Sequence, residues 1–448
     1  MSFMQNLVRA RGHIIFLLAL IAGFFLVRWL DTLDNDAIVD TTSGSEQVAT
    51  GAGTMDAFAN LTPLPLTQPR PSTAQELEYA DIAWTYFVNN TNPDTGLVNS
   101  VNNYPSTTMW ETGSYLVAIL SAERLGLIEA QEGTDRIEAV LTSLAQLRLF
   151  EGVLPNKAYH TATLELVDYS NQPSERGLGW SALDVARIIA SFALVERNHP
   201  ELAPEVEALM QIWQLDQMVN DGELIGTNVV DGETRLNQEG RVGYEQYAAR
   251  AMMMFGFDVY RAYNIEDNVM IREVEGLPIP VDSRMFRGAT PAFVVSEPYL
   301  FDGLEFGFDA RSWRFASTIY GAQEARFERT GQLTAVSEGH LNQPPYFAYS
   351  SVWGGGSEWA VLSFQAERLD SRRTISTKAS FGWDALFGTE YTAQLVEAIS
   401  VLGDPEQGWA EGIYEQGGTI NDSITANTNA VILAALSFRT SGPLMRAP

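Results

Sequence analysis

Carboxylic residues stand beside aromatic residues at three places in this chain, and that pairing could do chemistry. Two of the places are Trp110-Glu111 and Tyr244-Glu245, and the third is the segment SEPYLFDGLEFG at residues 296–307. Aromatic rings stack on the apolar faces of pyranoses, while carboxyl groups bind sugar hydroxyls and transfer protons. The pattern therefore indicates a sugar-processing cleft. We predict catalytic roles for Glu297, Glu111, Glu245 and Asp302, and substrate-binding roles for Trp110, Trp180, Tyr244 and Tyr299.

Acid–base chemistry on a glycosidic bond needs one protonated and one ionised carboxyl group, and so two unlike environments. Glu111 and Glu245 are each predicted in the first turn of a helix, where the helix dipole favours the ionised form. Each therefore suits a base. Glu297 precedes Pro298 among apolar residues, and crowding by apolar groups or by Asp302 would raise its pKa, which suits an acid.

Each assignment has a structural alternative that the sequence leaves open. Acidic residues in first helical turns often only stabilise the helix start, and Trp110 and Trp180 could be wedges between core helices. Asp184 and Asp384 each lie one turn into a predicted helix, and we interpret both as structural contacts.

Composition excludes several classes of function. Asp and Glu number 56 against 28 Lys and Arg, a balance that repels nucleic-acid phosphates, so we expect no nucleic-acid partner. The chain has no cysteine, which removes disulfides, thiolate metal sites and cysteine nucleophiles, and its four histidines are widely separated. We therefore predict no metal and no cofactor. Lys157 and Lys378 are the only lysines, a bias for which the sequence offers no functional explanation.

The N-terminal region predicts export. The apolar run IIFLLALIAGFFLV at residues 14–27 follows two arginines and precedes the acidic stretch DTLDND. We expect residues 1–12 in the cytoplasm and a transmembrane anchor at 13–30, with the N-terminus inside. This arrangement predicts a single-pass protein of the bacterial inner membrane whose main part is periplasmic. A cleaved secretion signal is the alternative. Residues 31–72, rich in polar residues, Gly and Pro, predict a disordered linker.

The elements that position the candidate residues are predicted as helical hairpins within one domain at 73–448. In each copy a helix ends in a glycine-containing loop, and a second helix opens at an aromatic residue with polar neighbours. Residues 272–295 break the pattern with strand-like runs. The predicted pairs are 76–88 with 110–125, 134–150 with 180–195, 204–219 with 244–260, 311–330 with 376–387, and 391–402 with 427–438.

Hairpins that repeat about every 55 to 75 residues do not match the shorter repeats of common solenoids. They predict an all-α fold, an (α/α)6-type toroid of five or six hairpins with a few short strands. Outer helices would surround inner ones, and the loops before the inner helices would converge on one mouth.

Several segments together resemble the bacterial domain-of-unknown-function family 3131. They are AWTYFVNNTNPDTGLVNSVNNYPSTTMWETGSYLVAI, GLGWSALDVARII, RVGYEQYAAR, SEPYLFDGLEFG and ISTKASFGWDALF, in order across about residues 73–440. The acidic residue of the MW(D/E)TGS motif is usually Asp in that family, whereas here it is Glu111. The resemblance implies an exported or membrane-anchored protein of a Gram-negative bacterium. It also implies a fold similar to the glucoamylase-like (α/α) toroids, which include β-1,2-glucan-degrading enzymes.

These observations predict a membrane-anchored periplasmic glycoside hydrolase or transglycosylase that acts on a β-glucan or another envelope polysaccharide. One alternative is a noncatalytic glycan-binding or envelope-assembly protein. The other is a polysaccharide lyase, against which the sparse His and Lys content argues. The expected partners are a polysaccharide or oligosaccharide and, through the N-terminal helix, the inner membrane.

Overall fold

The computed structural model describes residues 57–58, 61–284, 286–287 and 290–446. The predicted cytoplasmic segment 1–12 and anchor 13–30 lie outside these residues, as does most of the predicted linker. Within the described ranges, no helix combines the length and the hydrophobicity needed to cross a membrane.

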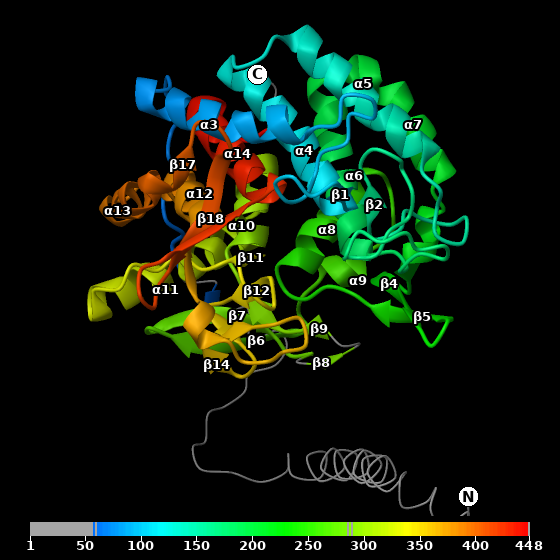
Figure 1. Ribbon diagram of the computed structural model, residues 1–448. Helices are drawn as coiled ribbons and strands as arrows, with labels where there is room; N and C mark the ends of the chain where they lie inside the picture. The colour runs from blue at the N-terminus through cyan, green and yellow to red at the C-terminus, as the bar shows by residue number, and fades with distance from the viewer. Residues whose placement is uncertain (1–56, 59–60, 285, 288–289, 447–448) are drawn as a thin grey trace, which may run out of the picture. The chain divides into compact units, whose positions relative to one another are not determined.

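A closed ring of six helical segments forms the centre of the described domain (Figure 1). Each segment contacts the next, and the last contacts the first. In order, they are α4 (Met109–Leu125), α6 (Ala182–Asn198), α8 (Tyr244–Met254), α10 (Glu297–Phe301) continued by the π-helical turn η3 (Asp302–Phe306), α12 (Thr377–Phe387) and α14 (Ala426–Ser441).

Outer helices precede the inner ones along the chain and pack outside them. In Figure 1, α5 and α7 lie at the right-hand edge of the ring and α11 and α13 at the left. The inner helix α4 has buried residues on every side, whereas α5 buries only one apolar stripe, as its position requires. The outer helices are α3 (Ala74–Asn90), α5 (Ala130–Gln146), α7 (Ala203–Ile212), α9 (Tyr260–Tyr263), α11 (Ala310–Thr330) and α13 (Glu390–Ile399).

The five predicted hairpins correspond to five of these pairs, and the pair formed by α9 and α10 was not predicted. Helix α9 is a single turn, and α10 with η3 spans only residues 297–306, with Pro298 at its start. Segments this short carry too few turns to show a helical period. The candidate segment SEPYLFDGLEFG is therefore an inner helix of the ring.

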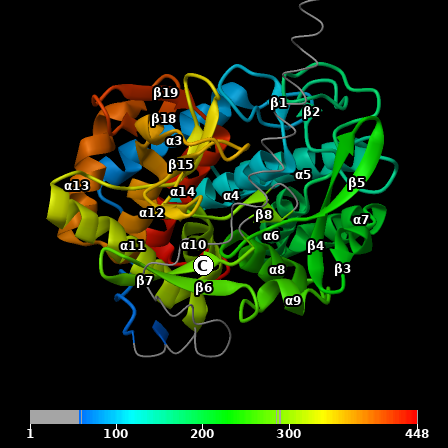
Figure 2. The same ribbon diagram turned by 90° about the horizontal axis from the view of Figure 1, so that it is seen from below.

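Short antiparallel strands occupy the connections, as Figure 2 shows on the flank of α7, α8 and α9. The predicted strand-like run at 272–295 contains β7 and β10. The longer strands are β4 (Glu223–Val230), β5 (Glu233–Gln238), β6 (Val269–Val274), β7 (Leu277–Asp282), β11 (Glu338–His340), β12 (Phe347–Ser350), β16 (Thr374–Ser376), β18 (Gly408–Tyr414) and β19 (Ile420–Ile424). The two-residue strands are β1 (Ser106–Thr107), β2 (Tyr159–His160), β3 (Val219–Asn220), β8 (Phe286–Arg287), β9 (Thr290–Pro291), β10 (Phe293–Val294), β13 (Trp353–Gly354), β14 (Ser357–Glu358), β15 (Val361–Leu362) and β17 (Gly403–Asp404).

The last part of the predicted linker, residues 61–72, has no helix or strand but is fixed to the domain. The indole Nε1 of Trp313 donates to the Leu64 carbonyl at 2.9 Å, and the Thr67 amide donates to the Leu386 carbonyl at 2.9 Å. Phe58 is buried against Phe315, with ring centroids 4.7 Å apart. The packed unit thus begins before residue 73, because an extended segment can bury apolar side chains without showing any period in its sequence.

Candidate active site

Polar side chains from the first turns of several inner helices meet at one end of the ring, which we call the mouth. Thr108, Ser181, Ser376 and Thr425 are the N-cap residues of α4, α6, α12 and α14, and each side chain accepts a hydrogen bond from its own helix. Glu111, Asp184, Lys378 and Asn427 stand two or three residues after these caps. They define two neighbouring groups of side chains.

The first group surrounds Asp184 in the first turn of α6. Glu239 accepts hydrogen bonds from the Ser181 hydroxyl at 2.8 Å and from the Ala182 amide at 2.6 Å, so its carboxylate caps the same helix. Burial, together with the charges of Glu239 and Glu111, raises the pKa of Asp184 to about 8. Lys157 opposes that shift with its positive charge. Asp184 is therefore a carboxyl group that keeps its proton at neutral pH.

The second group surrounds Lys378 in the first turn of α12. Its ammonium forms a buried ion pair with Glu297, and Glu297 also accepts a hydrogen bond from the Asn427 amide at 2.8 Å. Glu338 and Glu411 lie close enough to raise the pKa of Lys378 together with Glu297, against the effect of burial. Three carboxyl groups thus surround one lysine.

Glu111 and His340 connect the two groups. The charges of Glu111 and Glu297 both act on the His340 ring, and burial lowers the pKa of His340, which favours the neutral imidazole. The Glu111 carboxyl accepts a hydrogen bond from the Thr108 hydroxyl. Glu111 therefore lies near Asp184 and shares the neighbour His340 with Glu297.

An aromatic wall faces these groups from the sheet of β11 and β12. Phe347 pairs with His340 across the strands, and Tyr349 pairs with Glu338, so all four side chains lie on one face of the sheet. The Phe293 ring stacks on Tyr349 with centroids 4.0 Å apart. Burial and the charges of Glu338 and Asp184 raise the pKa of Tyr349, so this wall lies near both groups.

Tyr169 adds an aromatic ring beside the first group. Burial and the charges of Asp184 and Glu239 raise the pKa of Tyr169, so its ring lies near both acids. Aromatic rings beside unlike carboxyl groups can bind a sugar and protonate a leaving oxygen.

The structure places two other candidate carboxylates in buried ion pairs with arginines. The Arg284 guanidinium contacts Glu245 at 2.5 Å and Asp282 at 2.6 Å. Asp302 contacts Arg250 at 2.6 Å and accepts from the Ser312 hydroxyl at 2.5 Å. Both carboxyl groups have pKa values raised mainly by burial, but each is held by an arginine. Of the four candidate carboxylates, the structure brings Glu111 and Glu297 together.

The four candidate aromatic residues are largely interior. Trp180 donates its indole N–H to the Ile225 carbonyl at 2.9 Å and is 5% exposed. Trp110, partly buried, packs its ring against Tyr244 with centroids 5.4 Å apart, and Tyr299 is 3% exposed. The burial of Trp180 and the packing of Trp110 fit the alternative of core wedges, which the sequence left open for these two residues.

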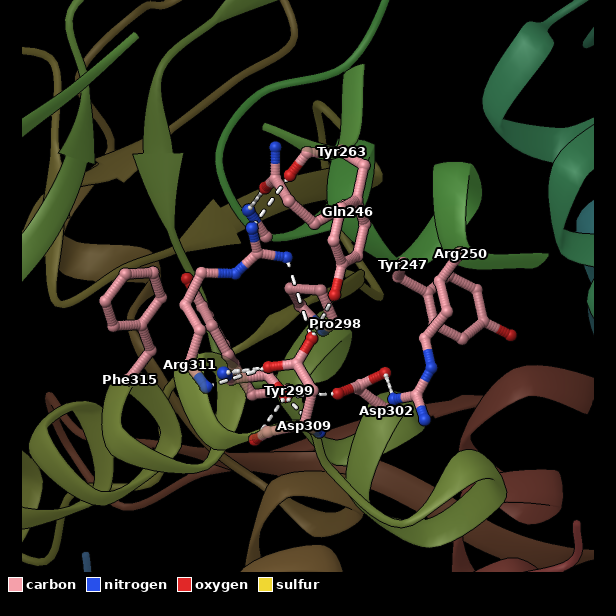
Figure 3. Close-up of a pocket in the computed structure, with 12 residues that line it drawn as sticks. Gln246, Tyr247, Arg250, Tyr263, Pro298, Tyr299, Asp302, Asp309, Arg311 and Phe315 are labelled. Carbon is pink, nitrogen blue, oxygen red and sulfur yellow. Dashed lines mark hydrogen bonds and ion pairs between the residues drawn. The ribbon is translucent and has the colours of Figure 1, made fainter. Parts of the chain in front are cut away.

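Asp302 and Tyr299 instead line a small pocket between α8, α10 and α11 (Figure 3). Arg250 and Arg311 enter it from opposite sides, and the figure shows them reaching toward Asp302 and Asp309. The Tyr263 hydroxyl donates to Asp309 at 2.6 Å. Each acid in this pocket has a basic or hydroxyl partner. We therefore interpret these pairs as structural contacts that hold the neighbouring helices together.

Sequence reasoning did not predict that Asp184, Glu239, Glu338 and the aromatic wall lie near one another. Ser181-Ala-Leu-Asp184 is a helix start, and the alternation of Phe347, Ala348, Tyr349 and Ser350 is a strand signal. Both signals were visible. Neither signal shows which strand faces which helix, so the sequence could not predict that these residues lie close together.

Comparisons with known proteins agree with the architecture. The family described as "Protein of unknown function (DUF3131)" matches residues 78–442. No curated protein matches the sequence. A provisionally assigned glucoamylase from Bacteroides caccae has a TM-score of 0.61 and 14% identity, covering 83% of this chain and 95% of that one.

Two similar solved structures are β-1,2-glucanases. The endo-β-1,2-glucanase of Chitinophaga pinensis, in complex with sophorotriose and glucose, has a TM-score of 0.60 and 13% identity, covering 84% of this chain and 94% of that one. An endo-β-1,2-glucanase mutant from Talaromyces funiculosus, with β-1,2-glucan, has a TM-score of 0.52 and 11% identity, covering 83% and 85%. At these identities the likeness shows a shared fold.

Proposed function

This chain belongs to the DUF3131 family, and from that premise we propose that it is a glycoside hydrolase or transglycosylase acting on a β-glucan or a related envelope polysaccharide. One observation carries the proposal: Asp184, with a pKa of about 8, lies in the mouth beside a second carboxyl group, Glu111. A proton donor and a second carboxyl group at one site are what cleavage of a glycosidic bond requires. The shared fold with β-1,2-glucanases supports the same substrate class.

In the proposed mechanism, Asp184 gives its proton to the glycosidic oxygen as the bond to the anomeric carbon breaks. Burial raises the pKa of Glu239 too, but hydrogen bonds from Ser181 and Ala182 and the charge of Lys157 favour its ionised form. The charge of Glu239 in turn favours a proton on Asp184 until transfer. Glu111 stabilises the positive charge that develops on the sugar ring. It then either bonds to the anomeric carbon or takes a proton from the attacking water.

This assignment moves the acid from Glu297 to Asp184. Glu297 is paired with Lys378 and accepts from Asn427, so a proton on Glu297 would break a buried ion pair. Glu297 instead helps to hold Lys378 and Asn427 in position at the mouth. Glu111 keeps the partner role predicted from its position at the start of α4.

The test is digestion of a glycan panel by the full-length chain, with linear and cyclic β-1,2-glucans and other β-linked glucans. We expect shorter or transferred products from at least one glucan. Asp184→Asn should lower kcat by about 10² to 10⁴-fold, the usual contribution of a general acid, without lowering the melting temperature. Binding of glycans without any cleavage would favour the noncatalytic alternative, and an unsaturated uronate product would favour a lyase.

We also propose the predicted location, with residues 13–30 as an inner-membrane anchor and the domain in the periplasm. A reporter enzyme that is active only in the periplasm, fused after residue 448, should be active and should sediment with membranes. A soluble periplasmic product would indicate the cleaved-signal alternative, and an inactive reporter would contradict export.

A further inference from the structure

An open groove lies between the end of helix α7 and the turn that follows α8. Its volume is about 540 Å³, within the range of cavities that bind ligands. The buried side chains of Trp213 and Leu215 line it, together with the partly buried side chains of Met210, Phe255 and Phe257. The groove is therefore large enough to take several apolar side chains of a partner.

Three large apolar side chains next to the groove are exposed. Ile212, Met253 and Met254 directly precede or follow lining residues along the chain, and each is between 41% and 48% exposed. Exposed apolar groups that gather in one place mark interaction sites, whereas scattered ones do not. Methionine is flexible and polarisable, which suits a surface that adapts to another protein.

The turn after α8 holds the two phenylalanine rings in a fixed arrangement. Gly256, between them, has a φ of 83° in the left-handed region that glycine adopts freely. The amides of Phe255 and Phe257 both donate to the Met252 carbonyl, at 3.0 and 3.3 Å. A surface that is already ordered loses little conformational freedom when a partner binds.

The groove carries only negative charge. Glu207 and Asp216 line it together with three glutamines, and none of its ten lining residues is basic. Arg250 and Arg261, the bases on either side of residues 251–260, are each paired with an acid. An acidic surface attracts a positively charged partner and repels an acidic one.

Three possible occupants from this chain itself fit the groove poorly. A second copy would bring the same acidic surface and a net charge of −28. Residues 31–56, which lie outside the described residues, contain six acids and no base. Residues 1–12 contain two arginines but lie across the membrane in the location that we propose. The charge of the groove therefore favours a different protein as the occupant.

The groove is separate from the mouth. Helix α8 begins at Tyr244, whose ring packs against Trp110 in the first turn of α4, so this end of α8 lies at the mouth. Phe255 follows the other end of α8, and the 11 residues between them span about 16 Å as a helix. The groove and the candidate acids are therefore two distinct sites.

We propose that this groove binds a basic amphipathic helix of another envelope protein. Apolar side chains of that helix pack against Met210, Phe255 and Phe257, and its lysines or arginines face Glu207 and Asp216. The contact holds the domain beside its partner. This proposal does not depend on the enzymatic activity of the mouth.

The experiment measures the affinity of the full-length chain, held in discs of neutral lipid, for a model helix. The probe is a peptide about four turns long, with leucine at helical spacing and lysine elsewhere, and empty discs give the background. We expect saturable binding of the probe. A scrambled peptide of the same composition should have a Kd at least about 10-fold higher, because its leucines do not share one face.

Charge reversal tests the two acids of the groove. The double variant Glu207→Lys, Asp216→Lys changes exposed side chains and should raise the Kd of the probe about 10-fold or more. The double variant Glu78→Lys, Asp81→Lys makes the same change of charge at exposed positions of α3, and should leave Kd within about twofold. A probe with glutamate in place of lysine should bind the groove variant more tightly than it binds the wild type.

Phe257→Ala tests the apolar contact and should also raise the Kd of the probe about 10-fold or more. A melting temperature for every variant shows whether it folds, and the charge variants still decide the question if Phe257→Ala does not. The proposal is overturned if the wild-type chain does not bind the probe, or binds the scrambled peptide equally well. Equal losses in the two double variants would mean that the probe is attracted only by the overall charge.

A neutral glycan is the other class of ligand that the experiment can detect. If β-glucan oligosaccharides bind the wild-type chain, Phe257→Ala abolishes that binding and the probe does not bind, the groove is a glycan site and the proposal is wrong. Asp184→Asn, which changes the mouth, should bind the probe as the wild type does. Loss of glucan cleavage in that variant with unchanged probe binding would separate the two sites.

Discussion

Asp184 shows at the scale of a single residue how environment decides chemistry. An exposed aspartic acid has a pKa of about 3.9 and is ionised at neutral pH. Burial and the neighbouring charges of Glu239 and Glu111 raise the pKa of Asp184 to about 8. The same side chain thereby becomes a proton donor under physiological conditions.

The raised pKa also makes a prediction about stability. Folded Asp184 holds its proton more tightly than the unfolded chain does. The stability that this bound proton contributes is therefore full at low pH and is lost as pH rises toward about 8. Asp184→Asn cannot lose a proton. Calorimetry should therefore show that the melting temperature of the variant rises relative to that of the wild type, steadily, between about pH 4 and pH 8.

Asp94→Asn, an exposed turn residue, is the control, and its difference from the wild type should stay flat over the same range. A difference for Asp184→Asn that shrinks with rising pH would mean that Asp184 is stabilised in its ionised form, and the acid assignment would then be wrong.

Glu245 tests the structural interpretation of a residue that the sequence favoured as catalytic. Its carboxylate pairs with Arg284, and both side chains are almost fully buried. Breaking a buried ion pair costs up to about 3–5 kcal/mol, and less here because Asp282 remains beside Arg284. Glu245→Gln should therefore lower the melting temperature while kcat/KM for a cleaved glucan stays within a few-fold of the wild type. Lost turnover at an unchanged melting temperature would instead restore the catalytic prediction.

At the scale of elements, the hairpin of β4 and β5 sets the position of the Asp184 group. A Cβ atom at Gly226 on β4 would lie 2.1 Å from Glu239 Oε2, so only glycine lets Glu239 reach the start of α6. This contact couples the strand to the helix start, together with the hydrogen bonds between Trp180 and β4. Sequence shows the glycine but not its neighbour.

Gly226→Ala should displace the Glu239 carboxylate and remove its bonds to Ser181 and Ala182. Loss of a helix cap costs about 0.5–2 kcal/mol, which calorimetry should detect as a lower melting temperature. Because the charge of Glu239 helps to raise the pKa of Asp184, the alkaline limb of the pH–rate profile should move to lower pH. Gly321→Ala in α11 meets only the flexible end of Leu277, and should change neither quantity appreciably. An unmoved alkaline limb in Gly226→Ala would show that Glu239 does not control Asp184.

At the scale of the whole molecule, a chain of polar side chains crosses the centre of the ring. Arg187 is fully buried, contacts Glu305 at 2.9 Å and lies 4.2 Å from the Phe301 ring centroid. Ser114 donates to Asn427 at 3.0 Å, and Asn427 donates to Glu297. Residues from α4, α6, η3 and α14 thus belong to one network of polar contacts, which reaches Glu297 at the mouth.

The segment before α3 contributes to the stability of this ring. Phe58 is 1% exposed and contacts Phe315 of α11. Replacing a buried Phe by Ala typically costs about 3–5 kcal/mol, so Phe58→Ala in the full chain should lower the melting temperature clearly. Val401→Ala removes a side chain that is 72% exposed and should have little effect. Equal melting temperatures for both variants would mean that residues before 73 do not belong to the folded unit.

The sequence by itself determined the hairpins that are long and periodic. The apolar spacing of residues 76–88 and 134–150 located α3 and α5 to within a few residues, because one buried face imposes a period of 3.6. It also determined the acidic balance and the presence of Glu111 at a helix start. These features depend only on residues that are close together in the sequence, so sequence patterns are enough to predict them.

Tertiary structure alone decided which side chains share an environment. Glu111, Asp184, Glu239 and Glu338 come from four separate segments, and only closure of the ring brings their charges together. Glu245 and Asp302 look similar to them in sequence but are paired with Arg284 and Arg250. The pKa of a carboxyl group depends on burial and on charges within a few ångströms, and both are properties of the folded chain.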